Sequence, residues 1–144
     1  MQTETTLTDE DARTALDAMA SACAAKGLKA VLAVADHHGE LIALLRLAGA
    51  PLASVQIAAN KAYSAARERK PSREIGQAAR DPVDGFEIAY FGDRRMTGWG
   101  GGLPVVVGGA CVGAVAVSGL SEDEDVDVAE IGVKAVIAGT RFRQ

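Results

Sequence analysis

The chain has 144 residues, of which 49% are hydrophobic, 24% are charged and only 4% are aromatic. This length and balance predict a single globular domain, residues 1–144, with a core of small aliphatic side chains. The net charge of −4 and the lack of basic clusters interleaved with aromatic residues argue against nucleic-acid binding, and no apolar run is long enough to cross a bilayer.

The first residues predict an arm followed by a helix. Residues 1–7 are expected to form a flexible or loosely docked arm, and they lack the basic and apolar regions of a secretion signal, which favours a cytoplasmic protein. Thr8 is a good N-cap for a helix with an acidic first turn. Gly27 is the expected end of that helix.

Two strands are expected next, over residues 31–35 and 41–45. A polar turn, Asp36-His37-His38-Gly39, separates them. Both runs are apolar throughout, which predicts a sheet covered by helices on both faces.

The middle of the chain predicts two helices and an irregular segment. An alanine-rich helix is expected over about 52–68, and a shorter one from Pro71 to about Ala79. Residues 80–98 contain several helix breakers and, with Trp99, most of the aromatic side chains. Long irregular segments of this kind are often functional.

The last part predicts a hairpin and a helix. Two apolar runs flank Gly108-Gly109, a dipeptide typical of tight hairpin turns because both glycines reach positive φ. Ser121 and Glu124 have the spacing of a capping box, so the acidic run that follows is better explained by the helix N-terminus than by a metal site. Cys23 and Cys111 are expected to be small buried thiols, not a disulfide or a metal pair.

The order of several short segments resembles one protein family. Over residues 8–140 the pattern is similar to the GlcG/HbpS family, also called the haem-degrading or DUF336 domain. The segments that carry the resemblance are Gly27-Leu28, Val34-Ala35-Asp36 with Gly39, Arg46, Gly49-Ala50-Pro51, Ser54, Lys61-Ala62, Ala65, Gly101-Gly102 with Pro104, Gly113, and Val117-Ser118-Gly119.

The resemblance implies an α/β (α+β) domain with a central antiparallel sheet and helices on both faces, similar to profilin-like folds. It also implies homo-oligomers and, in some members, haem binding. The chain departs from the family pattern at Leu47-Ala48 and in the acidic link at 120–124, both near the expected pocket. The resemblance implies haem as the one cofactor, and the two departures leave the identity of the ligand open.

His37 and His38 are the only histidines of the chain. They belong either to a plain polar turn or to a site in which one of them, His38 first, is an axial ligand of haem iron or a proton carrier. No cysteine or further histidine lies at ligand spacing, and two adjacent turn residues are expected to point in different directions, so no metal-ion site is predicted here.

Two basic residues are further candidates. Arg46 ends an apolar strand, either as a solvated strand end or as a clamp for a carboxylate or a haem propionate. Lys61 lies within the alanine-rich helix, where it either reaches solvent or faces a pocket as a base or Schiff-base former.

The remaining candidates come from the glycine-rich region. Trp99 is either a stacking surface for a flat ligand or a core or interface residue. Gly101 and Gly102 offer backbone amides, and Ser118 is a polar strand end in the same expected pocket wall.

Two functions follow from these candidates. The first is a homo-oligomeric binding protein for haem or another planar anionic molecule, with segment 86–99 at an interface or a shared pocket. The second is a cofactor-free lyase, isomerase or hydrolase, in which Arg46 orients a substrate carboxylate, Lys61, His37 or His38 moves the proton, and the amides of Gly101 and Gly102 stabilise negative charge. A packing subunit of a larger assembly stays open as a third.

Overall fold

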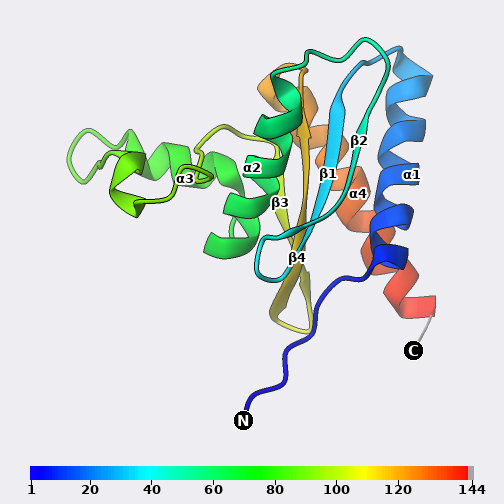
Figure 1. Ribbon diagram of the computed structural model, residues 1–144, viewed down its shortest axis with the longest axis horizontal. Helices are drawn as coiled ribbons and strands as arrows, with labels where there is room; N and C mark the ends of the chain where they lie inside the picture. The colour runs from blue at the N-terminus through cyan, green and yellow to red at the C-terminus, as the bar shows by residue number, and fades with distance from the viewer. Residues whose placement is uncertain (143–144) are drawn as a thin grey trace.

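The computed structural model describes residues 1–142 and contains a four-stranded antiparallel sheet with strand order β2-β1-β4-β3 (Figure 1). The elements are α1 (Asp9–Lys26), β1 (Val31–Asp36), β2 (Leu41–Arg46), α2 (Ser54–Glu68), α3 (Ser72–Ala79), a 3₁₀ turn (Ile88–Phe91), β3 (Gly102–Val107), β4 (Ala110–Ser118) and α4 (Glu122–Phe142).

Helices cover both faces of the sheet, as predicted. Helices α1 and α4 lie side by side on one face, and α2 lies on the other (Figure 1). Strand β1 serves both layers, because Leu32 and Val34 belong to the core under α1 and α4, whereas Val31 and Ala33 pack against α2. The α+β class with a central antiparallel sheet is therefore confirmed.

Helix α2 touches the sheet through alanines. Ala58, Ala62 and Ala65 are fully buried against the strands. Side chains of this size let the helix axis approach the sheet closely, and they leave little volume between the two layers. This close packing fixes α2 in a position where its last turn lies beside the start of β4.

The cover is uneven between the first two strands: β1 is buried on both faces, whereas β2 is partly exposed. Leu41 and Leu45 of β2 are 50% and 39% exposed. The reason is topological. β2 is an edge strand of the sheet, and the flanking helices are centred on the inner strands (Figure 1).

The N-terminal arm was expected to be flexible or loosely docked along all of residues 1–7, but its end is packed. Leu7 is only 5% exposed, and its N–H donates to the Val112 carbonyl over 2.9 Å. The Thr6 hydroxyl accepts from the His37 N–H over 3.1 Å. These contacts fix the path of the chain just before α1.

Several local predictions are confirmed. Thr8 and Asp11 form a capping box at the start of α1, and Ser121 and Glu124 form another before α4. Gly108 and Gly109, between β3 and β4, have φ of +57° and +80°, as a tight hairpin requires. Within residues 1–142, no helix combines the length and apolar character needed to cross a membrane.

Candidate functional site

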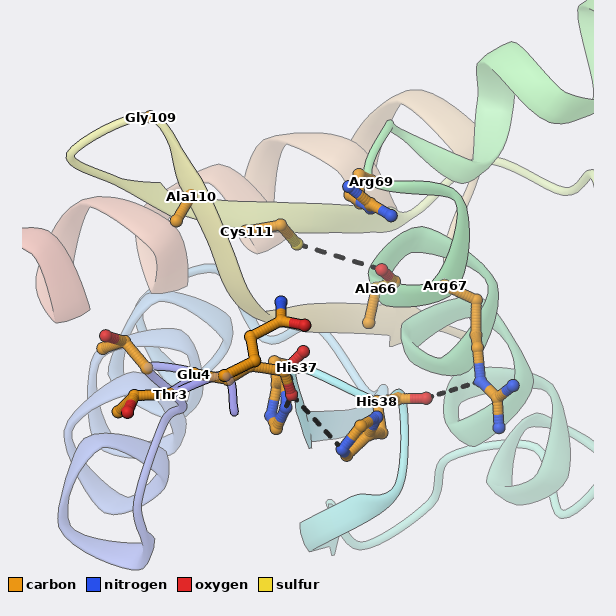
Figure 2. Close-up of a pocket in the computed structure, with 12 residues that line it drawn as sticks. Thr3, Glu4, His37, His38, Ala66, Arg67, Arg69, Gly109, Ala110 and Cys111 are labelled. Atoms are coloured by element: carbon orange, nitrogen blue, oxygen red, sulfur yellow. Dashed lines mark hydrogen bonds and ion pairs between the residues drawn. The ribbon is translucent and has the colours of Figure 1, made fainter.

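A pocket of about 600 Å³ lies where four separate segments meet. Its walls come from the N-terminal arm, the β1–β2 turn, the end of α2 and the β3–β4 turn (Figure 2). The residues that line it are Gln2, Thr3, Glu4, Thr5, His37, His38, Ala66, Arg67, Arg69, Gly109, Ala110 and Cys111.

The β1–β2 turn presents its histidines from a fixed backbone. The Asp36 carboxylate accepts from the N–H groups of His38 and Glu40 over 2.9 and 3.0 Å. The Arg67 Nε of α2 donates to the His38 carbonyl over 2.6 Å. The turn also approaches α2 closely at Gly39, where an added Cβ would lie 2.9 Å from the Tyr63 carbonyl oxygen.

The two imidazoles lie together, contrary to the expectation that they point in different directions. Their ring centroids are 3.8 Å apart. The Nε2 of His37 lies 2.5 Å from Glu4 Oε2, and the Nε2 of His38 lies 3.7 Å from the same oxygen. The His37 side chain is 18% exposed and that of His38 is 63% exposed. The Nδ1 of His37 is buried without a hydrogen-bond partner among the described residues.

The end of α2 brings two guanidinium groups to the pocket, Arg67 beside His38 and Arg69 across from it (Figure 2). The Arg67 Nε donates to the His38 carbonyl, and the Arg67 Nη2 lies 3.9 Å from the Glu40 Oε1. Arg69 follows the last residue of α2 with a φ of +55°, a left-handed conformation that ends the helix. Its exposed side chain makes no ion pair within residues 1–142 and lies beside the pocket (Figure 2).

Small side chains line the floor between these walls. Ala66, Ala110 and Cys111 occupy the space between α2 and β4 (Figure 2). Cys111 is half-buried, and its Sγ lies 3.4 Å from the Gly113 carbonyl oxygen. Both cysteines are free thiols, and the prediction that both are buried is correct for Cys23 and wrong for Cys111.

Lys61 and Ser118, two of the predicted site residues, are buried away from this pocket. The Lys61 ammonium donates to the Val117 carbonyl over 3.0 Å and to the Asp125 carboxylate over 3.1 Å. Burial raises the pKa of Asp125, although the Lys61 charge acts in the opposite direction. Ser118 ends β4 beside this pair and is 4% exposed.

Gly101 and Gly102 border a separate hollow of about 240 Å³, together with Arg73 of α3. The N–H of Gly102 donates to the Ser72 hydroxyl over 2.9 Å. Arg73 is held by Glu122 and Asp123 of α4, at 3.1 and 2.7 Å. The Gly102 amide and the Arg73 guanidinium at this hollow are therefore already engaged with other residues of the protein.

Arg46 and Trp99 lie outside both hollows. Arg46 ends β2 with an exposed side chain. Trp99 is 60% exposed, its carbonyl accepts from the Ser72 hydroxyl over 2.7 Å, and its N–H donates to the Thr97 hydroxyl over 3.4 Å. Of the residues proposed from the sequence, the structure thus brings His37 and His38 into the larger pocket and leaves Arg46 and Trp99 outside both hollows. The other four, Lys61, Gly101, Gly102 and Ser118, lie together at the end of β4, where a Cβ on Gly101 would be 3.0 Å from the Lys61 Nζ and one on Gly102 would be 2.3 Å from the Lys61 carbonyl oxygen.

Sequence reasoning missed Glu4 and the arginines at the end of α2. Glu4 belongs to an arm whose docking depends on Leu7, a single apolar residue next to a helix cap. Arg67 and Arg69 look like ordinary solvated residues at a helix end. The sequence contained one signal for this site, the polar turn. Gly39 of this turn has no side chain, so the turn can pack closely against a neighbouring helix.

A family model described as "Haem degrading protein HbpS-like" matches residues 7–134. A 15.0 kDa protein in the dhaT-dhaS intergenic region of Citrobacter freundii is 35% identical over 116 residues, which are 78% of this chain and 82% of that protein.

Two crystal structures show the same fold. The Klebsiella pneumoniae protein ORFY has a TM-score of 0.90 at 27% identity, and the match covers 96% of this chain and 95% of that one. A complex of PduOC with haem has a TM-score of 0.83 at 22% identity, and the match covers 90% and 94% of the two chains.

Proposed function

Since this chain belongs to the HbpS-like family, as its sequence pattern predicts, we propose that it binds haem or another planar anionic molecule in the pocket beside His37 and His38. The observation that carries the proposal is the placement of the exposed imidazole of His38 opposite the guanidinium of Arg69, across one pocket of about 600 Å³. This guanidinium forms no ion pair with the residues that the structure describes. The haem complex of PduOC, which has the same fold, supports it.

The donor groups of this pocket fit an iron porphyrin. A histidine imidazole is a common axial ligand of haem iron, and His38 offers one at the rim. Guanidinium groups bind carboxylates in a bidentate manner, so Arg69 suits a propionate better than the more distant Arg46. Ala66 and Ala110 leave the floor open to a flat ring. Bound haem would supply an iron centre whose reactivity depends on this ligand and on the polarity around it.

The described lining residues include no large apolar side chain, so one chain covers a porphyrin only in part. We therefore also propose that the protein works as a homo-oligomer. Segment 86–99 exposes apolar rings that a second copy would cover, since Tyr90 is 79% and Trp99 is 60% exposed. Light scattering should give a multiple of the 14.8 kDa chain mass. A monomer mass would overturn this part, and an unchanged mass in Trp99→Ala would place the tryptophan outside the interface.

Haemin titration of the purified protein tests ligand binding. We expect a saturable shift of the Soret band at one haem per chain or per pair of chains. His38→Ala should change the Soret position and weaken binding, and Arg69→Gln should weaken it by about tenfold, the value of a charge-assisted contact. Arg13→Gln, on the exposed side of α1, is the matched control. No saturable shift in the wild type would exclude haem.

The geometry favours binding over cofactor-free catalysis. A proton-transfer role for Lys61 requires a free ammonium in a pocket, and this one is bound to Asp125 and Val117. An oxyanion role for Gly102 requires a free amide, and this one donates to Ser72.

We also propose a cytoplasmic location, because a reducing compartment maintains free thiols such as those of Cys23 and Cys111.

A further inference from the structure

Three potential metal ligands converge at the edge of the pocket. One donor atom from each of Glu4, His37 and His38 lies within 4.8 Å of the other two. No other trio of His, Cys, Asp or Glu within the part of the chain that the structure describes converges in this way. Figure 2 shows Glu4 reaching from the arm toward both imidazoles of the turn.

The backbone holds these side chains in place before any ion binds. The turn that carries His38 is fixed by Asp36 on one side and by Arg67 on the other. The arm is anchored through the buried Leu7, three residues after Glu4. Ligands supported in this way lose less entropy on binding than ligands on a free segment.

We propose that Glu4, His37 and His38 bind a divalent transition-metal ion, with Zn²⁺ as the best fit. Two imidazole nitrogens and one carboxylate oxygen form a ligand set that suits zinc and neighbouring transition metals and disfavours Ca²⁺ and Mg²⁺, which prefer oxygen. Three protein ligands leave one position open, as in sites where zinc binds water or a small molecule. All three ligand residues line the pocket.

The distances require only small movements. Two ligand atoms of a tetrahedral zinc ion are about 3.3 Å apart, from zinc–ligand distances of about 2.0 Å. The contact between His37 and Glu4, now 2.5 Å, must open by roughly 0.8 Å, and the contact between His38 and Glu4, now 3.7 Å, must shorten by roughly 0.4 Å to reach that value. Rotation of the Glu4 side chain, which is 45% exposed, changes both of these distances, and the two imidazole ligand nitrogens already lie within 4.8 Å of each other.

The metal site does not depend on haem binding. It uses the same imidazoles, so an ion on both histidines would exclude haem iron from His38. A protein that binds zinc but not haem would keep this inference and exclude haem from the proposed function. A protein that binds haem but not zinc would keep the proposed function and overturn this inference.

Calorimetric titration of the metal-free protein, made without an affinity tag, tests the site. We expect one Zn²⁺ per chain, and we expect Glu4→Gln and His38→Ala to weaken binding at least tenfold each, because each removes a direct ligand. Asp17→Asn, an exposed carboxylate on α1, is the matched control and should bind as the wild type does.

Co²⁺ absorption gives a second measurement that does not depend on affinity alone. The wild type should show the intense visible bands of a tetrahedral ion, and both ligand variants should lose them. His38 is largely exposed, so its variant is expected to fold, and circular dichroism without metal verifies this. Substoichiometric zinc, or unchanged zinc affinity in folded Glu4→Gln and His38→Ala, would overturn the proposal.

Discussion

Lys61 and Asp125, which are 64 residues apart in sequence, form an ion pair of 3.1 Å in which each side chain is only 4% exposed. The pair joins α2 to the first turn of α4. The same ammonium donates to the Val117 carbonyl at the end of β4, and the other Asp125 oxygen accepts from the Leu120 N–H over 3.1 Å. One buried pair therefore connects both helical layers to the end of the sheet.

Removal of one partner of this pair should destabilise the protein strongly. Lys61→Met leaves Asp125 buried without its counter-charge, and such changes cost about 3–5 kcal/mol. Urea unfolding followed by circular dichroism measures the loss. The double variant Lys61→Met/Asp125→Leu should recover much of it, because no uncompensated charge remains. A single-variant cost below about 1 kcal/mol would show that water reaches the pair.

Gly102 is predicted to tolerate no side chain. An added Cβ would lie 2.3 Å from the Lys61 carbonyl oxygen, a backbone atom that has no room to move. Gly102→Ala should cost about 3 kcal/mol or more. Gly109→Ala is the comparison, because nothing lies within 4 Å of its Cβ, and its φ of +80° alone should cost about 1 kcal/mol. Equal losses in the two variants would contradict this account.

The sequence predicted the layers of this fold well because most of its signals are local. Each of these signals acts within a few residues. They are the helix caps at Thr8 and Ser121, the glycine pair at 108–109 and the apolar strands. The exposure of Leu41 follows from strand order, which no local pattern encodes. The meeting of Glu4 with His37 likewise depends on where Leu7 packs, a contact with β4 made across more than a hundred residues.

Acid should reveal the contact between Tyr63 and Asp93. The Tyr63 hydroxyl and the Arg95 N–H donate to this carboxylate and hold the pKa of Asp93 below its usual 3.8. The resulting stability is present above pH 3.8 and is lost as the pH falls through the lower folded pKa. The stability difference between the wild type and Asp93→Asn should therefore be largest near neutrality and should narrow below pH 3.8. Urea unfolding at a series of pH values measures it, and a constant difference would contradict the assignment.

Leu7 should matter to both stability and metal binding. Leu7→Ala should cost about 2 kcal/mol, since it removes a buried leucine side chain from the core. It should also weaken Zn²⁺ binding several-fold, since Glu4 loses its anchor. Leu16 of α1 also packs against the core. Leu16→Ala is therefore the comparison, and it should destabilise the protein without changing zinc affinity. Unchanged zinc affinity in Leu7→Ala would show that the arm positions Glu4 by other contacts.

Zinc and haem should compete if both use His38. A haemin titration of zinc-loaded protein should show weaker binding or an altered Soret position compared with metal-free protein. Glu4→Gln should remove this difference, because it weakens the zinc site and leaves the imidazole of His38 in place. Identical haem titrations with and without zinc would show that the two ligands occupy separate sites.

The placement of the arm has a practical consequence for anyone who fuses or immobilises this protein. Gln2 and Thr3 line the pocket, so the start of the chain stands at its opening. A carrier joined ahead of Met1 would begin at that opening. The amount of ligand that such a fusion binds would then depend on access past the carrier as well as on the affinity of the pocket.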